Sequence, residues 1–200
     1  MTTTPSVTGL ITEASGAAIP LAIVRAGEYA GFAAGIKPHV QTWLKSVHFG
    51  GKPGQYALLP GEGGAFSGVL AVISDRDDPW AFSHLPAGLP EGQYRIERLP
   101  KGADVNALAV GWGLGCYQFS RYKKPKRLAS LAMPREADAS RVQAFTGAIG
   151  MARNLINTPA SDLHTEALAD AAAELAGRYG AACHILKGKQ LTEENFPAIY

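Results

Sequence analysis

Short apolar runs alternate with segments of helical periodicity along much of the chain. Aliphatic runs of this length, bounded by glycine, proline or charged residues, are typical of buried strands. Strands are predicted at residues 19–26, 55–60, 69–73 and 128–133, and in a run through Tyr94, Ile96 and Leu99. Polar residues alternate with apolar ones in the run through Tyr94, which predicts a strand at the edge of the sheet.

Apolar residues spaced by three and four predict the helices between these strands. One helix covers residues 40–47 and stops at the glycine pair that follows. Asp78 and the proline after it are an N-cap and first-turn signal for a short helix over residues 79–85. Residues 86–92 are predicted to form a loop, because every second position is proline or glycine.

A longer apolar helix is predicted to begin at Asp104 and to extend through Phe119. Five basic residues follow within residues 121–127, where positive charge would favour the negative end of the helix dipole. Strands and helices that alternate at this length predict an α/β domain with helices on both faces of a sheet.

The pattern changes after Pro134. One long helix is predicted over residues 136–157 and a second over residues 165–179, with Gly180 in the position that ends a helix. Asp162 or Thr165 is expected to cap the second helix. The remaining elements are a strand over 182–186, a short helix over 191–196 and an apolar run over 198–200, and we expect the domain that begins here to continue beyond the last residue.

Composition supports a globular protein and gives little indication of a partner. The 200 residues are 46% hydrophobic and 18% charged, and the net charge of +2 is too small to indicate nucleic acid or an anionic membrane as a partner. Cys116 and Cys183 form no CxxC pair, so we expect reduced thiols in the cytoplasm. We expect neither a signal peptide nor a membrane-spanning segment.

Two glycine-rich segments resemble phosphate-binding motifs. Residues 111–115 read GWGLG, but a dinucleotide fingerprint needs a further glycine and a strand before it, so close packing of a helix is the favoured interpretation. Residues 61–68 read GEGGAFSG and lack the Gly-Lys-Ser/Thr ending of a P-loop, so a hairpin or plain loop is favoured. This second loop stays the best candidate for a ligand cleft.

Histidines and basic residues supply the other candidates. His164-Thr165-Glu166 has the H-x-E form of zinc deaminases but lacks their cysteine motif, and no HExxH is present. The other histidines are scattered: His39, His48, His84 and His184. The basic residues 121–127 together with Tyr122 could contact nucleic acid, although a solvated helix end is favoured.

An ordered set of motifs resembles the leucine aminopeptidase (cytosol aminopeptidase) family. Residues 152–161, ARNLINTPAS, resemble the segment that opens the catalytic domain of that family. Residues 54–64, 85–97 and 111–126 resemble segments of its N-terminal domain, and Asn195 to Pro197 also fits. His164-Thr165 departs from the family, which tends to have proline at the start of this helix.

The resemblance implies a fold and a parent enzyme. The expected fold is a three-layer α/β/α, macro-domain-like N-terminal domain over residues 1–133, a linker helix over 134–158 and the start of an α/β catalytic domain over 159–200. The implied enzyme is a cytoplasmic hexamer that removes N-terminal amino acids from peptides with a free amino terminus. It uses a water activated by two divalent ions, Zn²⁺ or Mn²⁺.

The family's metal ligands are expected beyond residue 200, because Asn157-Thr158 is followed by proline and no acid. We therefore assign no catalytic, cofactor-binding or metal-binding residue, and we expect this segment to be inactive alone. The alternatives are a macro-domain-like module that binds a nucleotide-like ligand and a module that braces an oligomer without catalysis.

Overall fold

The computed structural model describes residues 9–14, 16–76 and 78–199. The chain divides into two compact units, Met1–Met151 and Ala152–Tyr200, and each unit is described by itself. No helix of the described residues is long and apolar enough to cross a membrane.

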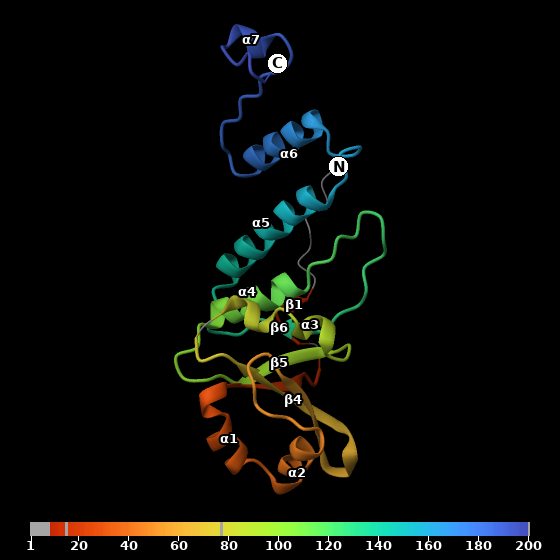
Figure 1. The fold of residues 1–200 in the computed structure, drawn as a ribbon, viewed down its shortest axis with the longest axis vertical. Helices are drawn as coiled ribbons and strands as arrows, with labels where there is room; N and C mark the ends of the chain where they lie inside the picture. Colours follow the sequence, from red (N-terminus) through yellow and green to blue (C-terminus); the bar gives the residue numbers. More distant parts are fainter. Residues whose placement is uncertain (1–8, 15, 77, 200) are drawn as a thin grey trace. The chain divides into compact units, whose positions relative to one another are not determined.

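The first unit is built on a six-stranded mixed sheet (Figure 1). Its strands are β1 (Leu10–Ile11), β2 (Ile19–Arg25), β3 (Tyr56–Pro60), β4 (Phe66–Ile73), β5 (Gln93–Arg98) and β6 (Ser130–Ala132). They lie in the order β1-β6-β5-β2-β4-β3, and every pairing is parallel except that of β3 with β4. Strands β5 and β2 are therefore central, β4 lies between β2 and β3, and β3 is an edge strand.

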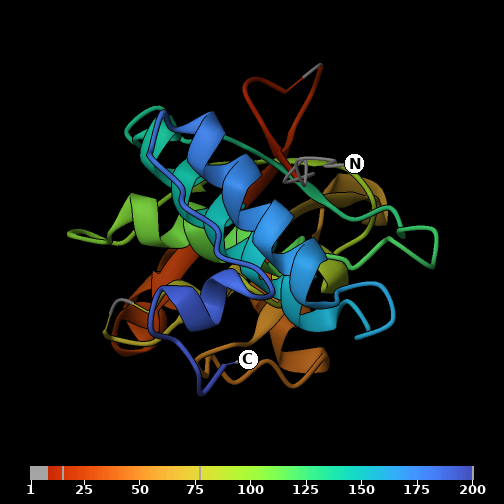
Figure 2. The same cartoon turned by 90° about the horizontal axis from the view of Figure 1, so that it is seen from above.

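Helices cover both faces of this sheet. The helical segments of the first unit are η1 (Ala26–Glu28), α1 (Tyr29–Gly35), α2 (Pro38–Ser46), η2 (Glu62–Gly64), η3 (Pro79–Phe82), α3 (Leu85–Gly88), α4 (Val105–Gly115) and the greater part of α5 (Ala139–Asn157). In Figures 1 and 2, α1 and α2 lie on one side of the sheet, and α3 and α4 lie on the other.

Alternation along the central strands divides the core into two clusters. Leu21 and Ile23 of β2 contact the side where Phe82, Leu85 and Trp112 are buried. Val24 of β2 points to the opposite face, where it packs with Leu44, Leu70 and Val72 beneath α1 and α2. Successive side chains of a strand point to opposite faces, so the observed fold has the three α/β/α layers expected from the sequence.

Several predicted elements of the first unit need correction. The run through Tyr94 is the interior strand β5, not an edge strand, because β6 and the unpredicted β1 extend the sheet beyond it. The helix begun by Asp104 ends at Gly115, so residues 121–127 are not its C-terminus. The predicted loop over 86–92 is wrong at its start, where α3 forms. Helix α1 was not predicted.

The second unit contains α6 (Thr165–Arg178) and α7 (Gln190–Glu193), close to the predicted helices. Gly180 ends α6 with φ 65°, as predicted. The N-cap prediction was wrong, since the side chain of His164 accepts the Ala167 N–H at 3.4 Å. Residues 182–186 form no strand, because no described strand lies beside them, and residues 198–199 form a turn. The rest of that last predicted run, Tyr200, lies outside the described residues.

Candidate functional site

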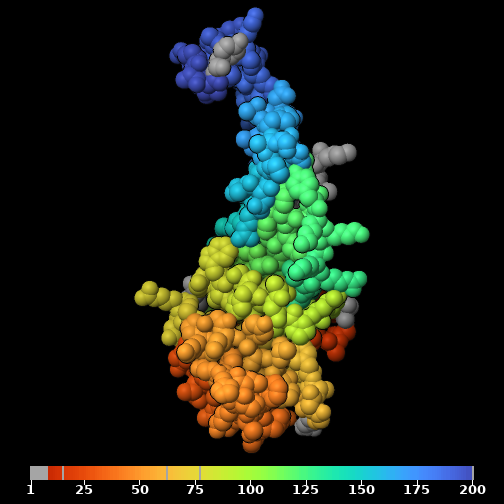
Figure 3. Space-filling model, turned by 45° about the vertical axis from the view of Figure 1, so that its right-hand side comes forward, coloured from red at the N-terminus to blue at the C-terminus, as the bar shows by residue number. Residues whose placement is uncertain are grey.

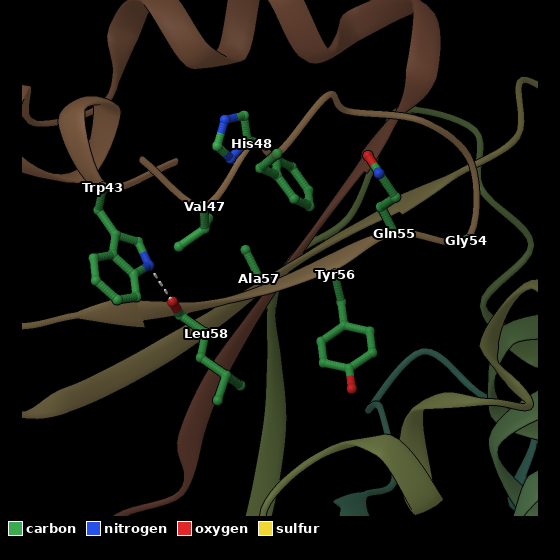
Figure 4. A pocket seen from close by; sticks show the side chains of 9 residues that line it. Trp43, Val47, His48, Gly54, Gln55, Tyr56, Ala57 and Leu58 are labelled. Atoms are coloured by element: carbon green, nitrogen blue, oxygen red, sulfur yellow. Dashed lines mark hydrogen bonds between the residues drawn. The ribbon is translucent and has the colours of Figure 1, made fainter. Parts of the chain in front are cut away.

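An open groove of about 530 Å³ lies beside the edge strand β3 (Figure 4). The end of α2, the connection after this helix and β3 itself form its walls. Its lining residues are Trp43, Val47, His48, Phe49, Gly54, Gln55, Tyr56, Ala57 and Leu58. We refer to it as the β3 groove.

The turn after α2 shapes one wall of the β3 groove. His48 has the left-handed φ of 53°, and its N–H donates to the Lys45 carbonyl at 3.1 Å. The Phe49 N–H donates to the Leu44 carbonyl at 2.9 Å. These two hydrogen bonds define a Schellman motif, in which glycine usually occupies the position of His48. The motif reverses the chain and brings Phe49 against the core cluster beneath α1 and α2.

Strand β3 forms the other wall. The indole Nε1 of Trp43 donates to the Leu58 carbonyl oxygen at 2.8 Å, as the dashed line in Figure 4 shows. Tyr56 and Leu58 point to the side opposite Trp43 in this view. The Tyr56 hydroxyl donates to the Gly88 carbonyl at 2.7 Å, which ties β3 to the end of α3.

The chemistry of the β3 groove favours apolar contact over catalysis. Its lining has no carboxylate, lysine or arginine. The Tyr56 hydroxyl is already donated to Gly88, and Gln55 Oε1 accepts the Lys52 N–H at 2.9 Å. A nucleophile with its base, or a metal site, needs several polar groups that converge on one point. The groove brings no such set together.

The glycines of residues 111–115 serve packing, as the sequence favoured. A Cβ on Gly111 would overlap the Pro79 carbonyl oxygen, and one on Gly115 would overlap the Ser83 carbonyl oxygen. The absence of side chains lets α4 approach the backbone of η3 directly. The segment is therefore a helix-packing surface and not a dinucleotide loop.

Residues 61–65 connect the antiparallel strands β3 and β4, and residues 66–68 belong to β4. Gly61 accepts from the Gly64 N–H at 3.1 Å and donates to the Ala65 carbonyl at 2.6 Å. Strands β3 and β4 pair on either side of this turn, so the hairpin interpretation is confirmed. Two backbone groups of Gly61 are thus used within the hairpin.

The carboxyl ends of the parallel strands carry a polar contact that the sequence did not indicate. The Gly27 N–H, after β2, donates to Asp75 Oδ1 at 3.0 Å. Arg25 Nη1 donates to the carbonyls of Ser74 at 3.2 Å and Asp75 at 3.0 Å. Ligands of open α/β sheets bind at this end of the strands, and here the Asp75 carboxylate of the chain itself accepts the Gly27 N–H within η1.

Histidines and cysteines form no joint site. Among the described residues, no group of three or more His, Cys, Asp and Glu side chains could hold a metal ion. His164 caps α6, which agrees with the favoured interpretation of a histidine at a helix start. Cys116 is buried and Cys183 is exposed. Burial raises the pKa of the Cys116 thiol to about 12, which makes it a poor nucleophile.

The basic residues 121–127 lie on a loop that reaches away from the sheet in Figures 1 and 2. All seven are exposed, and their side chains are part of the green surface that projects in Figure 3. Both ends of the Gln118 amide bond to the backbone of Lys126, each at 2.8 Å, and close the base of the loop. Arg127 pairs with Glu91 at 3.2 Å. The favoured interpretation as a helix end is therefore wrong.

Comparison with known proteins identifies the fold as an aminopeptidase N-terminal domain. The sequence profile of the M17 aminopeptidase, N-terminal domain, matches residues 19–134, more than half of the chain. The chain therefore belongs to the M17 aminopeptidase family. This confirms the resemblance to the N-terminal part of leucine aminopeptidases.

Individual proteins that resemble this chain are also aminopeptidases. A probable cytosol aminopeptidase from Syntrophotalea carbinolica is 31% identical over 134 residues, which cover 60% of this chain and 25% of that protein. The crystal structure of the cytosol aminopeptidase from Coxiella burnetii is 32% identical with a TM-score of 0.84, covering 96% of this chain and 42% of the other. A tomato leucine aminopeptidase mutant shares the fold alone, at 18% identity and a TM-score of 0.57, covering 92% and 45%. This chain spans less than half the length of these relatives.

Proposed function

We propose that this chain is the N-terminal portion of a metal-dependent leucyl aminopeptidase that removes N-terminal amino acids from peptides. The observation that carries the proposal is the likeness to the Coxiella burnetii cytosol aminopeptidase, which extends over 96% of the chain at a TM-score of 0.84. The names of the other relatives support a cytoplasmic location and peptide substrates with a free amino terminus.

The proposed cofactors are two divalent ions, Zn²⁺ or Mn²⁺, bound by the parent enzyme. A paired metal site lowers the pKa of a bound water and stabilises the oxyanion of the tetrahedral intermediate. A bottromycin maturation enzyme of the same fold has a solved structure in complex with Mn; it is 24% identical with a TM-score of 0.62, covering 89% of this chain and 40% of its own. The described residues do not fit such a site, because no acidic or histidine cluster exists among them. We therefore assign no step of the reaction to this chain.

We propose that residues 1–133 form the macro-like domain, 134–158 the linker helix and 159–200 the start of the catalytic domain. The role of the first domain would be to brace a homo-oligomer, a hexamer by resemblance. Its two-sided core and its lack of a polar catalytic set in the β3 groove support a structural role.

A chimera tests this proposal. Residues 1–200 alone and residues 1–200 joined to the remainder of the Coxiella burnetii enzyme would be assayed with leucine p-nitroanilide in Mn²⁺ or Zn²⁺. We expect no hydrolysis by the 200 residues, and chelator-sensitive hydrolysis by the chimera. The Coxiella burnetii remainder without this chain is the matched control. Hydrolysis by the 200-residue chain alone would contradict the assignment of all catalytic groups to the rest of the enzyme.

The macro-domain-like binding alternative is not favoured. Asp75 already accepts the Gly27 N–H at the carboxyl end of β2, so this backbone donor is used within the chain. Calorimetric titration with ADP-ribose should give no heat of binding. A saturable signal that Asp75→Ala strengthens would revive the alternative.

A further inference from the structure

The outer edge of β3 is the only long free strand edge of the sheet among the described residues, because β1 at the opposite end has two residues. Free edges present unpaired N–H and C=O groups to which a second chain can add a strand. Three ordinary protections are visible in β3. It has five residues, it ends in Pro60, and its register with β4 shifts between Leu59 and Pro60.

The direction of the free backbone groups follows from the pairing with β4. Val72 of β4 accepts the Gly54 N–H and donates to the Gln55 carbonyl, each at 2.9 Å, so the N–H and C=O of Val72 face β3. In an antiparallel pair these groups alternate between the two sides of a strand. Leu70 therefore also faces β3, opposite Ala57. The N–H and C=O of Leu58, the next residue, point to the open edge.

The side chain of Trp43 donates a hydrogen bond to the outward-pointing carbonyl of Leu58. Its indole Nε1 donates to Leu58 O at 2.8 Å, and the hydrogen bond joins residues 15 positions apart in the sequence. Trp43 is nevertheless 41% exposed, so burial of the ring does not account for its position. The acceptor of this indole N–H is the middle carbonyl of the edge strand.

We propose that Trp43 closes the free edge of β3 against strand addition by a second copy of this chain. Pro60 removes the donor at one end of the strand, and the indole removes the acceptor at its centre. Val47 and Leu58, respectively 43% and 37% exposed, are apolar surface that a second strand would cover. Loss of the indole N–H leaves a short apolar edge with an available acceptor.

Trp43→Phe tests the proposal, because it keeps an aromatic ring and removes the Nε1–H donor, together with part of the apolar area of the indole. Sedimentation velocity over a range of concentrations should show that the variant self-associates at about tenfold lower concentration than the unchanged chain. This factor is what one net hydrogen bond supplies. Adding Leu58→Lys to Trp43→Phe should restore the behaviour of the unchanged chain, since a charged edge residue opposes strand addition.

Val47→Ala is the matched control, since it removes apolar surface from the same groove and leaves the Trp43 hydrogen bond intact. It should not promote association. Equal association of Trp43→Phe and the unchanged chain, or failure of Leu58→Lys to reverse the effect, would overturn the proposal. Hydrogen exchange of the Trp43 indole in the unchanged chain gives a test that needs no variant. The proton should be protected, and exchange at the rate of a free indole would also overturn it.

Discussion

Gly111 is the position where a single methyl group should most clearly weaken the N-terminal domain. It lies inside α4, which packs against η3 through backbone contact. A Cβ on Gly111 would overlap the Pro79 carbonyl oxygen and lie 2.9 Å from the carbonyl carbon. Both atoms belong to the backbone, and Gly115 meets the Ser83 carbonyl in the same way. The helix cannot approach η3 as closely once the methyl group is present.

Two opposing effects determine the magnitude of Gly111→Ala. Alanine favours the helix over glycine by about 1 kcal/mol. Overpacking of a close-packed contact costs about 1–3 kcal/mol, and a rigid backbone obstacle favours the upper end. The expected net loss is about 2 kcal/mol in the free energy of unfolding. For a protein of this size, that loss lowers the thermal midpoint by about 4–8 °C.

Thermal unfolding followed by circular dichroism measures this change. Gly31→Ala is the control, because Gly31 is an exposed residue of α1 and a Cβ there meets nothing within 4 Å. That variant should be stabilised by about 0.5–1 kcal/mol through helix propensity. If Gly111→Ala unfolds at the same temperature as the unchanged chain or above it, α4 can move away from η3 without cost, and the packing argument is wrong.

Four further predictions concern a turn, a helix cap and the two thiols. His48→Gly should raise the urea midpoint by the equivalent of about 1 kcal/mol, because glycine adopts φ 53° without strain; a lower midpoint would contradict the Schellman assignment. Asp104→Ala should lose about 1 kcal/mol in the same assay, since Oδ1 accepts the Asn106 and Ala107 N–H groups at 2.9 and 3.1 Å, and Asp104→Asn should retain most of that stability. Burial raises the pKa of Cys116 from 9.0 to about 12, so the folded chain keeps a proton that the unfolded chain loses, and stability should fall as the pH rises from about 9 towards 12. Ellman's reagent should label only Cys183 in the folded chain and both thiols in denaturant; rapid labelling of two thiols in the folded chain would refute the burial of Cys116.

Local signals in the sequence predicted elements whose boundaries depend on neighbouring residues. The strand predicted at 19–26 is β2 (Ile19–Arg25), and the helix predicted at 165–179 is α6 (Thr165–Arg178). Asp78 and Asp104 cap their helices as expected, because a cap needs only the next two or three N–H groups. The glycines of residues 111–115 were also correctly assigned to packing.

Elements that depend on distant partners were predicted less well. The apolar residues 182–186 have the composition of a strand, but a strand needs another strand to pair with. β5 was predicted at an edge because its polar alternates indicated exposure, and its place became interior only through β1 and β6. The helix predicted to reach Phe119 ends at Gly115, after which the Gln118–Lys126 contact holds a loop.

Periodicity and capping act within a few residues, so the sequence alone indicated the α/β class and the faces that most strands and helices bury. The family followed from the resemblance of an ordered set of motifs, among them residues 152–161. The order of the strands, and with it which edge is free, became known from the folded structure. No short stretch of sequence indicates the β3 groove. The hydrogen bond from Trp43 to Leu58 forms only when α2 packs on the sheet and β3 pairs with β4. This contact depends on the packing of the whole core, because its two residues come from different elements that only the folded core brings together.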